Sequence, residues 1–427
     1  MSEQTHNVSR ESWWLHSTGW SLVLLAFLIP FPGKVPVAAV YLFGLFSLGE
    51  IISSAGKGNF FRFLACRIRR AAPGGHMWVF LLMPLLYLAG VLWSSEGSPW
   101  LFELEKKSLL LVFPLLAFAA SGKVFDKTWI RRILAGFAAG TLAVTLYLLV
   151  SALLSYRLTA DTSLFYYSRF SQWSHPSYLA MYVCFAMGIT GSYLTGYEEK
   201  SGWWRWLAGV ALMIWWVAMV VLLSSKAGFF GLIIALGYLA YRLSERWKRR
   251  SVWMLLVICL LVLIPTAWVF KPIRVRLASA VQNLTAPAPI SPTHRADGMV
   301  IRRESWKIAL DVWKENPVTG AGTGDYISET TQRIGDRGLL FPFGGYKNAH
   351  NQYLQTAATL GTMGLLVLLA WLLLPVWMPP GKPTGVHVFF LMLTGFNLLS
   401  ESMLEAQAGV IFIIVMQLLL FRHRQEQ

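Results

Sequence analysis

The chain has 427 residues, of which 56% are hydrophobic and 14% are charged, and its mean hydropathy is +0.52. This composition excludes a soluble globular protein of that size and indicates a polytopic membrane protein. The formal net charge of +16 comes largely from short loops, where it records membrane orientation, so no nucleic-acid partner is expected.

Twelve apolar stretches follow one another along the chain, with the length and composition of helices that cross about 30 Å of hydrocarbon. They lie near residues 18–33, 36–54, 77–95, 108–121, 133–155, 176–196, 206–223, 227–242, 252–270, 352–376, 386–401 and 407–421. We therefore predict an all-α polytopic membrane protein with about twelve transmembrane helices. Helices 1–9 fall within residues 1–270, one large loop spans residues 271–351, and helices 10–12 with a short tail occupy residues 352–427.

Basic residues form five clusters between these stretches, and Lys and Arg in short loops stay on the cytoplasmic side. The clusters lie at residues 57–70, 123–132, 200–205, 242–250 and 422–424. All five fall inside if the chain starts inside. This pattern predicts that both termini are cytoplasmic and that the large loop is periplasmic. The first apolar stretch has no small-residue cleavage site after it, so no cleavable signal peptide is expected.

An aromatic outer segment, YYSRFSQWSHPSYL at residues 166–179, leads into the sixth apolar stretch. Its Arg169, His175 and Tyr178 are candidates for contact with a glycan, because aromatic faces stack on sugars. The same composition is typical of the aromatic belt at a membrane interface. The residues alone leave both interpretations open.

A lysine lies at the outer rim of the membrane in the segment LLSSKAGFFGL. Ser224 and Ser225 predict a helix N-cap, which places Lys226 in the first helical turn. The helix dipole disfavours a cation there unless an anion lies nearby, so one interpretation is a phosphate site. The other is a lysine that snorkels to the interface.

The large loop is basic, with eleven Lys or Arg residues against seven Asp or Glu residues between Lys271 and His350. A basic outer loop of this length predicts an anionic ligand outside the membrane. Within it, TAPAPISPTHRADG is an irregular Pro-rich stretch, MVIRRESWKIALDVWKENP predicts an amphipathic helix that stops at Pro317, and GAGTGDY predicts a turn. No strand precedes these glycines, so we do not interpret them as a nucleotide-phosphate loop.

Helical phase separates two adjacent arginines in the amphipathic helix. Arg302 shares a largely apolar face with Trp306, Ala309 and Trp313, whereas Arg303 shares a face with Lys307 and Lys314. Arg302 is therefore expected to point inward, where an unpaired charge costs several kcal/mol. Its partner is either an acid of the loop, in a structural salt bridge, or an anionic ligand.

His350 lies where the large loop ends and the tenth apolar stretch begins. Eleven residues make close to three helical turns, which predicts Gly361 on the same helix face about 16 Å deeper, with Gly364 near it. Small residues at this spacing let helices approach closely. His350 is a candidate general base, or else an interfacial histidine held by hydrogen bonds. Glu401 and Glu405, at the outer end of the eleventh stretch, either form an acid pair or pair with loop cations.

The run His350-Asn351, nine residues, Gly361, two residues, Gly364 resembles the signature of the O-antigen ligase and polymerase superfamily. The segment SSKAG, Arg302 four residues before Trp306, and NPVTGAGTGDY fit the same family. HPSYLAMY (175–182) and ESMLEAQAGVIF (401–412) are similar to ligase-like members from Bacteroidetes-type bacteria. The resemblance spans most of the chain beyond the first two apolar stretches.

The resemblance implies a GT-C-like, metal-independent, inverting glycosyltransferase without a cofactor, which faces the periplasm from the bacterial inner membrane. Its donor is implied to be a glycan on undecaprenyl diphosphate. The acceptor is a sugar hydroxyl of lipid A core in a ligase, another lipid-linked repeat in a polymerase, or a protein in an oligosaccharyltransferase. His350 is implied to activate the acceptor hydroxyl, while Arg302 and Lys226 hold the diphosphate as it leaves.

Some assignments stay open at this level. Arg303 is one residue away from Arg302 and is the alternative donor-binding arginine, and Asn351 and Gln352 are further candidates for contact with acceptor or glycan. We favour the ligase on the similarity of residues 175–182 and 401–412. A flippase of lipid-linked sugars is an alternative of another class, but it needs charges at the membrane midplane, and few ionisable residues lie there.

Overall fold

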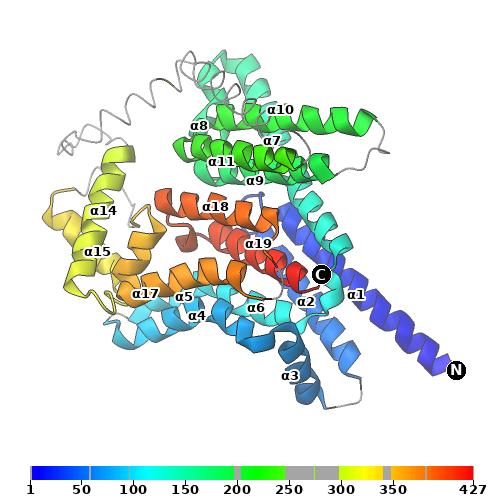
Figure 1. The fold of residues 1–427 in the computed structure, drawn as a ribbon. Coiled ribbons are helices and arrows are strands. Elements are labelled where there is room, and N and C mark those ends of the chain that lie inside the picture. The colour runs from blue at the N-terminus through cyan, green and yellow to red at the C-terminus, as the bar shows by residue number, and fades with distance from the viewer. Residues whose placement is uncertain are drawn as a thin grey trace.

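The computed structural model of the protein describes residues 2–56, 59–95, 97–196, 203–245, 274, 298–339, 348–379 and 382–426. Every regular element in these ranges is a helix (Figure 1). The α-helices are α1 (Ser2–Leu28), α2 (Val35–Ala55), α3 (Phe60–Ala71), α4 (His76–Ala89), α5 (Gly97–Lys107), α6 (Leu109–Ala119), α7 (Lys127–Thr159), α8 (Tyr167–Phe170), α9 (Pro176–Gly196), α10 (Trp203–Leu223), α11 (Lys226–Ser244), α14 (Gly298–Glu315), α15 (Tyr326–Asp336), α17 (Gln352–Trp377), α18 (Gly385–Ser400) and α19 (Gln407–Gln425). Short 3-10 turns join them at η1 (Pro73–Gly75), η2 (Gly90–Trp93), η3 (Gly122–Phe125), η4 (Thr162–Phe165) and η5 (Met403–Glu405).

Eight helices in the described part of the chain are long and apolar enough to cross a membrane. They are α2, α4 with η2, α7, α9, α10, α11, α17 and α19, and α18 is a shorter apolar helix. The chain is therefore a multi-pass membrane protein, and the predicted all-α fold class is confirmed.

The helices differ from the apolar stretches mainly at their ends. α1 begins at Ser2 and α7 covers 33 residues, because hydropathy marks the part of a helix that meets hydrocarbon and not its last hydrogen bond. The stretch predicted at 108–121 forms the short helix α6, and the stretch at 252–270 lies outside the described residues. α3, α5 and α15 were not predicted, since each is short and mixes apolar with charged residues.

Two helices form the centre of the bundle. α19 packs against α6, α7, α17 and α18, and α9 packs against α7, α10, α11 and α18. In α19 every side chain from Gly409 to Arg424 is buried. Most of α19 is apolar on all sides, which is typical of an interior helix, and its polar Gln417, Arg422, His423 and Arg424 are buried as well. In contrast, α10 exposes Trp203, Trp204 and Trp206 on a face suited to lipid.

α14 and α15 form a cap at one end of the bundle, away from both chain termini (Figure 1). Ile301 and Ile308 of α14 belong to one apolar cluster with Ile334 of α15. Ala309 and Val312 belong to another that includes Tyr326, Ala349 and Ala358, which ties α14 to the start of α17. The predicted amphipathic helix is confirmed, and its apolar face docks it against the membrane helix that follows His350.

α17 is broken at Gly361, which has φ 69° and ψ −167°. The break frees backbone carbonyls of the preceding turn, and the segment after α14 uses them: Ala321 N–H donates to Ala358 O and Gly322 N–H donates to Thr359 O, both at 2.9 Å. The glycine-rich segment is therefore a turn, as predicted, and the amides of Gly320, Ala321, Gly322 and Thr323 all donate to protein carbonyls.

We predicted that Gly361 and Gly364 let another helix approach α17, and this prediction is wrong, because neither glycine lies against another helix. A Cβ at position 361 would overlap the Val318 carbonyl of the loop after α14, and one at 364 would overlap Leu360 of the same helix. His350 also lies outside α17, so it shares no continuous helix face with Gly361. A long apolar pattern cannot reveal a single residue that leaves the helical region.

Gly361→Ala is expected to destabilise the protein by roughly 3 kcal/mol or more, because alanine would carry both positive-φ strain and a clash with backbone. The matched control is Gly237→Ala in α11, where a Cβ meets nothing within 4 Å. That change should leave stability unchanged or raise it by up to about 1 kcal/mol. Thermal unfolding of the two purified variants in one detergent checks the prediction, and equal melting temperatures would contradict it.

Candidate functional site

Glu401 is the centre of a polar cluster at the end of the bundle that carries α14. It directly follows α18 and is 6% exposed. Arg302 Nη2 of α14 donates to Glu401 Oε1 at 2.6 Å. His350 Nδ1 lies 3.5 Å from Glu401 Oε2, and His175 Nδ1 lies 3.6 Å from Glu401 Oε1. Three segments distant in sequence thus converge on one carboxylate.

The neighbours of Glu401 keep it ionised. Burial by itself would raise the pKa of this carboxyl group, but the long hydrogen bond from His350 and the charges of His175 and Arg302 outweigh it and lower the pKa to about 2. Glu401 is therefore an anion at neutral pH. Of the two alternatives for this residue, pairing with a loop cation is confirmed by its ion pair with Arg302.

His350 has a left-handed backbone, with φ 48°, which is uncommon for a residue other than glycine. Hydrogen bonds on both sides hold it: Ala349 N–H donates to Gln355 Oε1 at 2.8 Å, and Asn351 N–H donates to Ser402 Oγ at 3.1 Å. Strained residues held in this way cluster at functional sites. The bend lets the chain enter α17 while the imidazole lies against Glu401.

Asn351 and Gln352 form the wall of this site. Asn351 Oδ1 caps α17 by accepting from Leu354 N–H at 3.1 Å. Gln352 is fully buried, accepts from Leu404 N–H at 2.7 Å and donates to Thr356 Oγ1 at 3.1 Å. The structure therefore does not support the contact with a glycan that we predicted for Gln352, because its side chain is buried and its amide atoms form hydrogen bonds within the protein.

The two arginines of α14 are distinguished by their partners and not by burial. Their side chains are 18% and 22% exposed, respectively. Arg302 reaches another helix, whereas Arg303 Nε donates to its neighbour Glu304 at 3.1 Å, and that carboxylate also pairs with Lys307. The structure therefore brings Arg302 into the cluster, as its helical phase predicted.

Lys226 begins α11, and the predicted N-cap is confirmed for Ser225, whose Oγ accepts from Gly228 N–H at 3.3 Å. Ser225 Oγ also donates to Ser177 Oγ at 3.2 Å, which joins the start of α11 to the start of α9, next to His175. The N-termini of α9, α11 and α17 thus gather around the Glu401 cluster. Helix N-termini favour anions, so this end of the bundle suits a negatively charged ligand.

Two candidate residues of the aromatic segment 166–179 lie in different places, His175 at the Glu401 cluster and Arg169 at the surface. His175 contacts Glu401, and its ring centroid lies 6.3 Å from that of Tyr178. Arg169 pairs with Asp161 and is 58% exposed, so the structure does not bring it into the cluster.

A second ion cluster supports the first and was missed by the sequence analysis. Lys107 Nζ is buried at 2.7 Å from both Glu103 Oε2 and Glu405 Oε2. The attraction of these carboxylates outweighs burial and raises the pKa of Lys107. Glu405 therefore pairs with α5 and not with a loop cation, which anchors the residues after Glu401. Two adjacent lysines in the turn between two apolar stretches were the available signal.

Three further observations define the class of protein. Among the described residues, no three His, Cys, Asp or Glu side chains lie close enough together to hold a metal ion. The helices form a multi-pass bundle, and the anion-suited site lies at one end of it. The described part of the chain therefore belongs to a multi-pass membrane protein with a charged cluster at one end of its helix bundle.

Part of the chain matches a known protein family. Residues 208–369 match the family model described as O-antigen ligase. This range contains Lys226, Arg302, His350 and both motif glycines, and it ends before Glu401. No curated protein matches the chain. The match confirms the resemblance to the O-antigen ligase and polymerase superfamily.

Proposed function

We propose that the protein is an O-antigen ligase. It moves a glycan from undecaprenyl diphosphate to a sugar hydroxyl of lipid A core at the periplasmic face of the bacterial inner membrane. The observation that carries this proposal is the Arg302–Glu401–His350 cluster, which lies among three helix N-termini within and beside the region matching the O-antigen ligase family. The position of the basic helix α3 at the opposite end of the bundle supports this orientation (Figure 1).

His350 removes the proton of the acceptor hydroxyl in this proposal. Glu401 lies against Nδ1, which orients the imidazole so that Nε2 is the base and stabilises the imidazolium that forms. The acceptor oxygen forms a bond to the anomeric carbon as the bond from that carbon to the diphosphate oxygen breaks. Attack from the face opposite the diphosphate inverts the configuration. Glu401 acts as a positioning residue.

Arg302 and Lys226 hold the diphosphate in this proposal. Arg302 Nε is buried and has no hydrogen-bond partner among the described residues, so the guanidinium keeps a donor for a phosphate oxygen while Nη2 stays on Glu401. Charge develops on the diphosphate as it leaves, and fixed cations stabilise that charge. Lys226 supplies a point charge where an arginine would bind two oxygens at once.

A reconstituted transfer assay tests the proposal. Purified protein in EDTA receives an undecaprenyl-diphosphate glycan with lipid A core in one tube and without a second lipid in the other. Glycan on lipid A core alone supports the ligase. Longer chains on undecaprenyl diphosphate in both tubes would assign the same residues to a polymerase, and no transfer in either tube, with or without divalent metal, would contradict a glycosyltransferase.

A further inference from the structure

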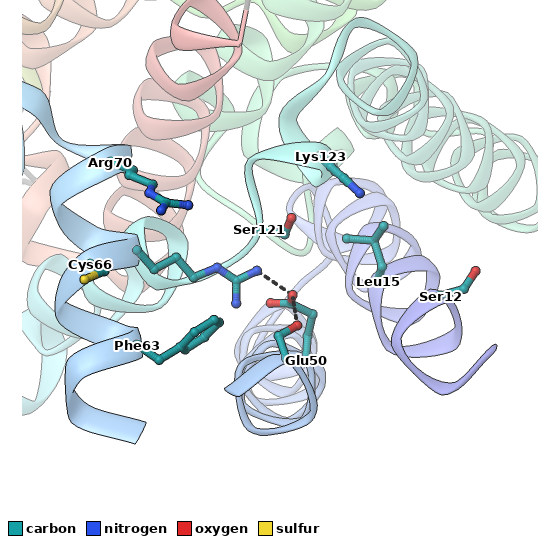
Figure 2. A pocket seen from close by; sticks show the side chains of 10 residues that line it. Ser12, Leu15, Glu50, Phe63, Cys66, Arg70, Ser121 and Lys123 are labelled. Atoms are coloured by element: carbon teal, nitrogen blue, oxygen red, sulfur yellow. Dashed lines mark hydrogen bonds and ion pairs between the residues drawn. The ribbon is translucent and has the colours of Figure 1, made fainter. Parts of the chain in front are cut away.

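A cavity of ≈ 530 Å³ lies between α1, α2, α3 and η3 (Figure 2). α3 lies at the end of the bundle opposite to α14 (Figure 1). Its lining contains three cationic side chains, Arg67 and Arg70 from α3 and Lys123 from η3. The hydroxyl groups of Ser12 and Ser121 also line it. The glycosyl-transfer site uses none of these residues.

The positive charge of the cavity exceeds its negative charge. Among the described residues that line it, the single acid is Glu50, which accepts from Arg67 Nη2 at 2.5 Å. Within the described ranges, Arg67 Nη1 is buried without a hydrogen-bond partner, and neither Arg70 nor Lys123 forms an ion pair. Arg422 is buried nearby and its Nη1 donates to Ala71 O at the end of α3 at 3.1 Å, but it adds no net charge, because Glu426 pairs with its Nη2 at 3.8 Å. One carboxylate thus faces three cations in a space large enough for an anion.

The surroundings of the cavity indicate which anion is present there. α3 is amphipathic and basic, and such helices lie in the membrane interface. Large aromatic side chains on the helices beside the cavity are exposed: Trp13 of α1 by 56%, Phe61 of α3 by 79% and Trp78 of α4 by 60%. Exposed Trp side chains near the ends of apolar helices mark the level of the lipid head groups. The most abundant anions at that level are phospholipid phosphates, and clustered Lys and Arg attract them.

We propose that this cavity binds the phosphate of an anionic phospholipid head group. Arg70 and Lys123 supply the charge, Ser12 and Ser121 donate hydrogen bonds, and the Arg67–Glu50 pair fixes the wall between them. The bound lipid bridges α1, α3 and η3, which lie apart in the sequence, and so stabilises this end of the bundle.

Lipid titration of the full-length protein tests the proposal. Melting temperature is measured against phosphatidylglycerol, against phosphatidylcholine as the neutral lipid, and against inorganic phosphate and glycerol phosphate as soluble sources of the same group. Phosphatidylglycerol should raise the melting temperature in a saturable way, while the other three should not. Equal effects of phosphatidylglycerol and phosphatidylcholine, or full protection by soluble phosphate, would overturn the lipid site.

Charge-matched variants locate the effect. Arg70→Gln with Lys123→Gln removes two cations from the cavity and should raise the half-saturating phosphatidylglycerol about 25-fold, or about fivefold for each residue. Arg62→Gln with Lys127→Gln removes two exposed cations from α3 and from the start of α7 that do not line the cavity. This control should shift the midpoint by less than about fivefold. Equal shifts in the two double variants would mean a diffuse surface charge and would contradict the proposal.

Cys66 provides a readout that does not depend on stability. It lines the cavity and is exposed, whereas Cys184 is buried. In a Cys259→Ser background, phosphatidylglycerol should slow maleimide labelling of Cys66 several-fold, and phosphatidylcholine should not. The Arg70→Gln, Lys123→Gln protein should lose this protection. Labelling that is insensitive to phosphatidylglycerol would overturn the proposal even if the melting temperature rises.

Discussion

His350→Ala is expected to reduce glycan transfer by at least about 100-fold, within the range that a positioned general base contributes. The imidazole lies against the Glu401 carboxylate, just before the start of α17. Without it, the acceptor hydroxyl keeps its proton as the new bond forms. Initial rates at saturating donor and acceptor measure the effect on kcat.

His350→Asn distinguishes the loss of the catalytic base from a change in the backbone conformation at this position. Asparagine tolerates the left-handed conformation at φ 48° better than most residues, and its amide reaches the same side of Glu401 as Nδ1 does. This variant should fold as well as the native protein and still be as inactive as His350→Ala. Normal transfer by His350→Asn would show that the residue only orients its neighbours.

Arg302→Ala is the second change with a large expected effect, about 100-fold or more in transfer, because it removes a fixed cation from the departing diphosphate. It also leaves the buried Glu401 carboxylate without its closest partner at 2.6 Å, which should cost about 3 kcal/mol of stability. Arg303→Ala is the matched control on the same helix. It should change transfer by less than about tenfold, since Arg303 pairs within α14.

The double variant Arg302→Ala, Glu401→Gln distinguishes the two consequences of losing Arg302. Removing both charges should restore most of the stability that the single change loses. Transfer should stay low, because no guanidinium is present to bind the donor. If transfer recovered together with stability, Arg302 would have no role in donor binding, and its pair with Glu401 would be a structural salt bridge.

Several features of the site were predictable because they depend on local order. The N-cap at Ser225 follows from a Ser-Ser pair before an apolar run, and the contact of Arg302 with another helix, where Arg303 pairs on its own helix, follows from its phase with Ala309. Both depend on spacing along one helix, which a sequence displays directly. The partner of Arg302 was not predictable in this way, because it lies 99 residues further along the chain.

The break in α17 could not be predicted from the sequence, for a different reason. Gly361 leaves the helical region only because the segment after α14 supplies amides to the carbonyls that the break exposes. The apolar pattern continues through this position without interruption. Glu401 was considered as a partner for loop cations. Its central place among Arg302, His350 and His175 depends on where α18 ends and where α9, α14 and α17 begin.

The sequence by itself determined the all-helical membrane class and the amphipathic helix with its inward arginine. Hydropathy and helical periodicity are visible within a few consecutive residues, so the helical class and the face of an arginine can be predicted without knowledge of the fold. Only the tertiary structure decided that His350, His175 and Arg302 meet on Glu401 and that Lys107 anchors the residues behind it. Buried charges must find partners wherever the packed helices place them, and that placement is a property of the whole bundle.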